Sequence, residues 1–142
     1  MIQLGGYAAV EYCGGPEINF RMGRETAESV DSGDNWKDGL TPREIVALMG
    51  RRTLGFLPPE DEYQGRWSMN PYVFDNTYYK ELLDENSPYL KLEDDKDLIN
   101  DPEYREHVEE FAQDQEAFFE AFANAFSKYS ERGFEDRLLS EV

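Results

Sequence analysis

The stretch Ile45-Val-Ala-Leu-Met-Gly-Arg-Arg-Thr-Leu-Gly55 decides the fold, because an apolar run ends there in two adjacent arginines. It follows Thr41-Pro-Arg-Glu44, which has the form of a helix start with a capping threonine, a first-turn proline and a capping-box glutamate. We therefore predict a short, mostly buried helix from Pro42 to about Arg52. Both arginines can keep their heads in water near the helix C-terminus. Alternatively, one points inward, and a buried cation then requires a carboxylate or another anion.

Length and composition fit one domain, or part of one, with a hydrophobic core: 142 residues, 39% hydrophobic and 14% aromatic. A single cysteine, Cys13, excludes an internal disulfide framework. No apolar stretch is long enough to span a membrane, and the N-terminus does not have the form of a signal peptide.

The chain is strongly acidic, with 14 basic and 31 acidic residues and a net charge of −17. Such a chain repels phosphate backbones, so we expect no nucleic-acid partner. Residues 81–116 hold fourteen of the acids against three basic residues. This segment is either a solvated surface or a docking face for a basic partner.

Residues 1–13 are small, apolar and almost uncharged, which predicts a helix buried against neighbours. Gly14-Gly15-Pro16 ends this helix, and the polar stretch from Glu25 to Gly39 is typical of a loop. Since the rest of the chain offers no obvious cover for a helix of this kind, we expect another chain to bury residues 1–13.

Several stretches resemble the class I haem peroxidases, the group that contains cytochrome c peroxidase and ascorbate peroxidase. The resemblance is carried by Gln3–Glu11 with the following Gly-Gly-Pro, by Arg21-Met-Gly-Arg24, by Ile45–Gly55, by Tyr63–Asn76 and by Phe111–Phe119. It covers nearly the whole chain but only the C-terminal half of the family. The resemblance implies a mainly α fold: the C-terminal (proximal) half of the haem-peroxidase helical fold, with at most a short β-hairpin, near Leu90.

We accordingly predict a single partial peroxidase-like domain over residues 1–142. It comprises a buried helix at 1–13, a loop at 14–40 and a proximal-half helical core at 41–142. Within this core, apolar spacing and caps predict helices at Asn76 to about Leu83, Glu103–Gln113 and Asp114 to about Arg132.

The resemblance also assigns a degenerate proximal site. Arg52 stands where the family has the iron-ligating His, and Arg51 stands at the small residue before it. Trp67 matches the proximal tryptophan, and Asp95 matches the aspartate that hydrogen-bonds both the His and the Trp. A guanidinium has no lone pair to offer iron. We therefore expect no catalytic residue and no haem, and we expect Arg52 to enter the ligand space, pair with Asp95 and contact the Trp67 ring.

Four losses lead to the functional prediction: the ligand His, the distal half, a haem-side helix and loop, and a second His in the segment after Gly55. We predict a non-catalytic peroxidase-like (pseudoenzyme) accessory subunit. It packs against a protein partner, which can itself be peroxidase-like, in a larger mitochondrial complex, with no direct membrane span. The alternative is half of a split haem peroxidase, completed by a second chain that supplies the distal side.

The resemblance implies one further site. Ascorbate peroxidases hold a potassium ion near the proximal helix, and its oxygen ligands fall here on Thr53, Ser68, Asn70, Val73 (carbonyl) and Asp75. These oxygens can hold K⁺, or they can simply brace the loop before the Asn76 helix. The lone His107 matches no ligand position, and we expect it to be an exposed or partly packed helix residue.

Overall fold

The computed structural model describes residues 2–23, 35–59, 65–134 and 138. Its elements are α1 (Ile2–Tyr12), α2 (Pro42–Met49), the 3-10 helix η1 (Gly50–Thr53), β1 (Phe56–Leu57), β2 (Gly65–Arg66), α3 (Thr77–Leu83), α4 (Glu93–Asn100), α5 (Pro102–Gln113) and α6 (Gln115–Glu131). The predicted fold class, mainly helical with one short hairpin, is confirmed. The predicted loop at 14–40 includes residues 24–34, which lie outside the described residues.

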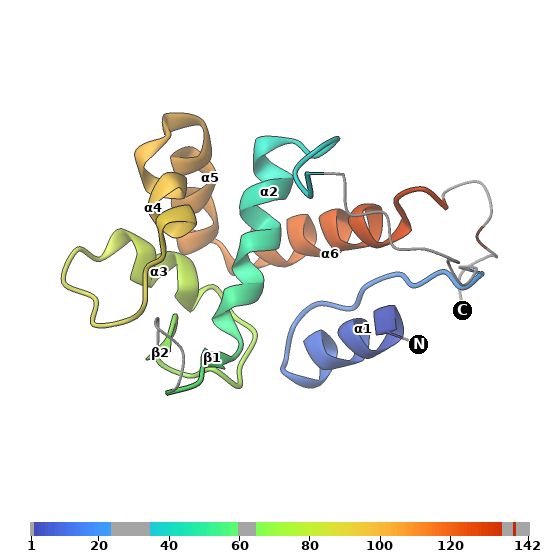
Figure 1. Ribbon diagram of the computed structural model, residues 1–142, viewed down its shortest axis with the longest axis horizontal. Coiled ribbons are helices and arrows are strands. Elements are labelled where there is room, and N and C mark those ends of the chain that lie inside the picture. The colour runs from blue at the N-terminus through green and yellow to red at the C-terminus, as the bar shows by residue number, and fades with distance from the viewer. Residues whose placement is uncertain (1, 24–34, 60–64, 135–137, 139–142) are drawn as a thin grey trace.

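Helix α2 stands at the centre of the molecule (Figure 1). Helices α4 and α5 lie on one side of it, α6 crosses it, and α1 lies alongside the C-terminal part of α6. The hairpin, formed by antiparallel pairing of Phe56 with Arg66 and Leu57 with Gly65, follows the end of α2.

The predicted start of α2 is confirmed. The backbone N–H of Thr41 donates to the Glu44 carboxylate (2.8 Å), and the N–H of Glu44 donates to Oγ1 of Thr41 (3.2 Å). The helix ends at Met49 instead of Arg52 and tightens into η1. The Tyr79 hydroxyl donates to the Val46 carbonyl (2.9 Å), which Gly50 N–H would use in a continuing α-helix. That N–H donates to the carbonyl of Ala47 instead.

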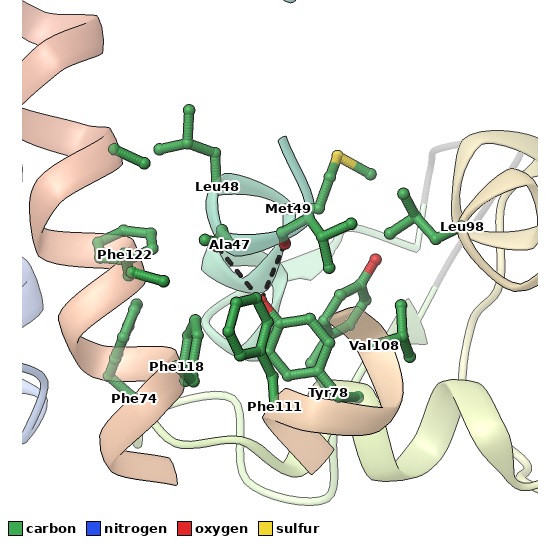
Figure 2. Packing of buried hydrophobic residues seen from close by; sticks show 14 of the residues in the cluster. Ala47, Leu48, Met49, Phe74, Tyr78, Leu98, Val108, Phe111, Phe118 and Phe122 are labelled. Atoms are coloured by element: carbon green, nitrogen blue, oxygen red, sulfur yellow. Dashed lines mark hydrogen bonds between the residues drawn. The ribbon is translucent and has the colours of Figure 1, made fainter. Parts of the chain in front are cut away.

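Aromatic rings fill the core between α2, α3, α5 and α6 (Figure 2). Phe118 lies at its centre, with ring centroids 5.0 Å from Tyr79, 5.4 Å from Phe74 and 5.9 Å from Phe111. Phe118 and Phe122 of α6 are both buried, as the spacing of aromatic residues on this helix predicts. The core therefore fixes the end of α2, which carries the two arginines.

Helix α1 is present as predicted, but its cover differs from the prediction. One face packs on this chain's own α6: the Tyr7 ring lies 5.0 Å from Phe126, and its hydroxyl hydrogen-bonds Oγ of Ser130 at 2.7 Å. The opposite face, with Leu4, Gly5, Ala8, Ala9 and Tyr12, is exposed.

The position predicted for the hairpin was wrong, and one helix was not predicted. The hairpin forms at 56–57 and 65–66, whereas Leu90 makes only one backbone hydrogen bond there, to the Arg66 carbonyl (2.9 Å). The extended stretch stops at Leu92 because its N–H donates to the Asp95 carboxylate (2.8 Å), which starts α4. Helix α4 was not predicted, since half of its residues are acidic and they show little apolar periodicity. Among the described helices, none has the length and apolar composition to cross a bilayer.

Candidate functional site

The site lies where η1, the loop after β2, α3 and α4 meet, and its centre is the carboxylate of Asp95. Asp95 is completely buried, although it sits in the acidic first turn of α4. A buried carboxylate is costly unless its oxygens are hydrogen-bonded and its charge is paired. The surrounding elements each supply one donor for this purpose.

Four donors meet the two oxygens of Asp95. Arg52 donates to Oδ1 and forms the ion pair, and the Tyr78 hydroxyl donates to the same oxygen at 2.6 Å. The Trp67 indole N–H (3.0 Å) and the Leu92 backbone N–H (2.8 Å) donate to Oδ2. The charge of Asp95 is therefore balanced and both oxygens are satisfied.

Arg52 is held on three sides. Its side chain is 14% exposed, its second terminal nitrogen donates to Asp94 at 3.1 Å, and its guanidinium carbon lies 5.4 Å from the centre of the Trp67 ring. Arg52 therefore points inward, as in the second of the two alternatives that the sequence left open. A guanidinium over an indole face adds a cation–π attraction.

Two groups of the site, Arg52 and Tyr78, have raised pKa values. Burial alone would lower the pKa of Arg52, but the carboxylate of Asp95 raises it above the usual value. The pKa of Tyr78 is raised well above its usual value, first by burial and then by Asp95. Tyr78 therefore keeps its proton and acts as a donor. The site therefore joins the Arg52 guanidinium, the carboxylates of Asp94 and Asp95, and neutral donors from Tyr78, Trp67 and the backbone of Leu92.

Arg51 points elsewhere. Its guanidinium donates to the Leu48 carbonyl at 3.1 Å and lies 5.9 Å from the Trp36 ring. The two arginines of the motif thus have different environments: Arg52 pairs with acids, and Arg51 faces a cleft beside α1.

The predicted potassium ligands come partly together. The Thr53 hydroxyl donates to Asp75 (3.1 Å), the Ser68 hydroxyl donates to the Thr53 carbonyl (2.8 Å), and Thr53 Oγ1 lies 3.5 Å from the Val73 carbonyl. Asn70 is exposed and accepts from the backbone N–H of Tyr72 (3.1 Å). These bonds suit a bracing role, and a bound potassium ion stays a prediction. His107 lies on α5, partly buried, with Nδ1 3.4 Å from the Glu110 carboxylate.

Sequence reasoning named Arg52, Trp67 and Asp95, but it missed two donors and one acid. Tyr78 was predicted only as part of an apolar helix face, and nothing in its spacing signals that the hydroxyl reaches Asp95. Asp94 was one acid within an acidic run. Leu92 contributes through its backbone, which side-chain identity cannot reveal.

Comparison with known proteins identifies the family. The peroxidase family model matches residues 1–114. The chain belongs to the peroxidase family. It is 40% identical to a probable peroxisomal L-ascorbate peroxidase 3 of Oryza sativa subsp. japonica, over 94% of this chain and 52% of the relative. It is also 41% identical to the cytosolic L-ascorbate peroxidase 2 of Arabidopsis thaliana, over 95% of this chain and 61% of the relative. The chain thus spans between half and two thirds of these relatives' length.

These relatives correct one prediction. The sequence-based prediction that the chain is not an enzyme is wrong, because the relatives that match nearly its whole length are named as enzymes. The inference failed because it moved from four losses, the ligand His among them, to the activity of a protein of which this chain spans only a part. The mitochondrial setting stays a prediction. The two relatives described above are named as peroxisomal and cytosolic.

The haem that the family implies does not fit the proximal position of this chain. All donors of the site converge on Asp95, and the guanidinium that replaces the His has no lone pair for iron. Within the described residues, no group of three His, Cys, Asp or Glu side chains could hold a metal ion.

Proposed function

We propose that this chain forms the proximal half of an ascorbate-peroxidase-type protein and acts by packing against a peroxidase-like partner chain that completes the fold. The observation that carries the proposal is the exposed face of α1. Tyr12 is 94% exposed and Leu4 is 45% exposed, and Ala8 and Ala9 lie exposed between them. Apart from Glu11, this outward face is uncharged.

An uncharged helix face of this kind is typical of an interface, because water solvates it poorly. The length of the relatives supports the same conclusion. About two fifths to one half of each relative has no counterpart in this chain, which leaves room for a complementary set of helices. The partner would supply the groups that handle peroxide, and any iron would take its axial ligand from outside this site, since Arg52 is engaged with Asp95.

The names of the relatives favour a peroxidase activity for the completed assembly, with ascorbate as the reductant. The contribution of this chain is then to hold its half rigid. The hydrogen bonds to Asp95 connect η1 with α3 and α4 and so fix the C-terminal end of α2. The mitochondrial setting predicted from the sequence belongs to this proposal.

The test is affinity capture of the tagged chain from its source at physiological salt, with mass spectrometry of the captured proteins and an ascorbate-oxidation assay with hydrogen peroxide. We expect a stoichiometric peroxidase-like partner and activity in the complex only. Ala9→Glu places a charge on the exposed face of α1, and it should abolish capture without unfolding the chain. Asn124→Glu adds the same charge at an exposed position of α6 and should leave capture intact. A chain recovered alone, with no partner in stoichiometric amount, would refute the proposal.

A further inference from the structure

A cleft of about 490 Å³ lies between α1, α2 and α6, apart from the Asp95 network. Its wall is mainly apolar and is formed by Gly6, Val10, Trp36, Leu48, Phe122 and Phe126. Figure 1 shows α1 running beside α6 and near the lower part of α2. Figure 2 shows Leu48 and Phe122 projecting from α2 and α6. Both the volume and the apolar lining are within the usual range for small-molecule sites.

Arg51 is the single charged residue among the described residues that line this cleft. Its contacts are the Leu48 carbonyl, the Met49 sulfur at 3.9 Å and the Trp36 ring, and it forms no ion pair with a carboxylate of the described residues. The pKa of Arg51 is lowered, first by partial removal from solvent and then by the adjacent charge of Arg52. Both effects mean that an anion placed at this guanidinium would be stabilised.

The remainder of the chain discriminates against anions. With a net charge of −17, its long-range field repels negatively charged molecules. A local cation beside an apolar surface can offset this repulsion. The rim of this cleft, with Arg51 beside Trp36 and Tyr129, provides that combination.

We propose that the cleft binds a small amphipathic anion, with its apolar body against α1 and α6 and its carboxylate or sulfonate on Arg51. The guanidinium offers a planar pair of N–H donors that matches a carboxylate. The aromatic rings of Phe122 and Phe126 provide the apolar contact for a hydrocarbon chain. This proposal is independent of the partner on the outer face of α1, because the cleft lies on the opposite side of that helix.

The test is calorimetric titration of the full 142-residue chain with decanoate and, in parallel, with its uncharged amide. We expect saturable one-to-one binding of decanoate, and binding of the amide that is at least tenfold weaker. Arg51→Gln should weaken decanoate binding by about tenfold or more and leave the amide unaffected, since hydrogen bonds to a charged group contribute about 1.5–3 kcal/mol. Arg51→Lys should retain the preference for the anion. Arg105→Gln removes an equal charge from an exposed position of α5 and should change neither affinity beyond twofold.

A second variant tests the cleft instead of the charge. A Cβ added at Gly6 would lie 3.4 Å from the Phe126 ring, so Gly6→Leu places its side chain in the cleft and leaves Arg51 unchanged. It should weaken both ligands at least tenfold, with circular dichroism used to verify that each variant is folded. Absence of saturable decanoate binding would overturn the proposal. So would equal decanoate affinity in the wild type and Arg51→Gln, or unchanged binding in Gly6→Leu.

Discussion

Replacing Arg52 by alanine should destabilise the chain by about 3–5 kcal/mol, the usual cost of removing one partner of a buried ion pair. The side chain is 14% exposed and Asp95 is completely buried, so little of this cost is screened by solvent. Asp95 would keep three donors, from Tyr78, Trp67 and the backbone of Leu92, which favours the lower part of that range. Loss of the cation–π contact with Trp67 adds to the cost.

A loss of this size is a large fraction of the total stability of about 5–15 kcal/mol that is typical of a domain. The midpoint of thermal unfolding should fall by roughly 10 °C, since 1 kcal/mol corresponds to roughly 3 °C in a domain of this length. The assay is urea unfolding followed by circular dichroism, with thermal melts in parallel. Arg105→Ala serves as the matched control, because its ion pair with Glu109 is exposed and should contribute only about 0.5 kcal/mol.

A double-mutant cycle with Arg52→Ala and Asp95→Asn then isolates the pair. We expect a coupling energy of roughly 1.5–3 kcal/mol, as for residues in one buried network. The reasoning is refuted if Arg52→Ala costs no more than Arg105→Ala, or if the coupling lies below about 0.5 kcal/mol. Either result would mean that Arg52 lies in solvent and that Asp95 is stabilised by its neutral donors alone.

Four further predictions concern the surroundings of the site and helix α1. Gly50→Ala should destabilise by about 1–3 kcal/mol in urea unfolding, because the added Cβ would lie 2.5 Å from the Phe118 ring. By contrast, Gly5→Ala meets no atom within 4 Å and should stabilise α1 by up to about 1 kcal/mol. The raised pKa of Tyr78 means that folding favours its neutral form. This stabilisation is complete below the ordinary tyrosine pKa of about 10 and declines as the pH rises above it. Tyr78→Phe should therefore flatten the alkaline fall in the free energy of unfolding, and an unchanged slope would contradict the assignment. Melting temperatures in KCl and in choline chloride at equal ionic strength should agree, because the Asp75 carboxylate already accepts hydrogen bonds from the Thr53 hydroxyl and the Thr77 N–H. A higher melting temperature in KCl that Asp75→Asn abolishes would instead show a bound potassium ion.

Helices with strong end signals could be predicted closely from the sequence. The cap and proline before α2 placed its start correctly, and the aromatic spacing of α6 placed its buried face, because both depend on neighbours in the sequence. The end of α2 could not be placed, since it depends on the Tyr79 hydroxyl, 33 residues away, reaching the Val46 carbonyl. Helix α4 could not be predicted for a related reason. Its first turn is stabilised by donors that reach Asp95 from other elements of the fold.

The candidate site shows the same division. The resemblance placed Arg52, Trp67 and Asp95 in one site, and the structure brings these side chains into contact. The hydrogen bond from Tyr78 to Asp95 depends on how α3 is rotated relative to α4, and residue spacing does not specify that rotation. The sequence also suggested that another chain would cover the whole of the first helix, yet Tyr7 packs on Phe126 of the same chain.

The most direct test of the central proposal is hydrogen–deuterium exchange of α1 in the isolated chain and in the captured assembly. The proposal predicts that amides of residues 2–13 exchange at least tenfold more slowly in the assembly, because a partner covers the face with Ala9 and Tyr12. Peptides of α5 should exchange equally in both samples and serve as the internal control. Equal exchange of α1 in the two samples would contradict the proposal that this helix is the docking face.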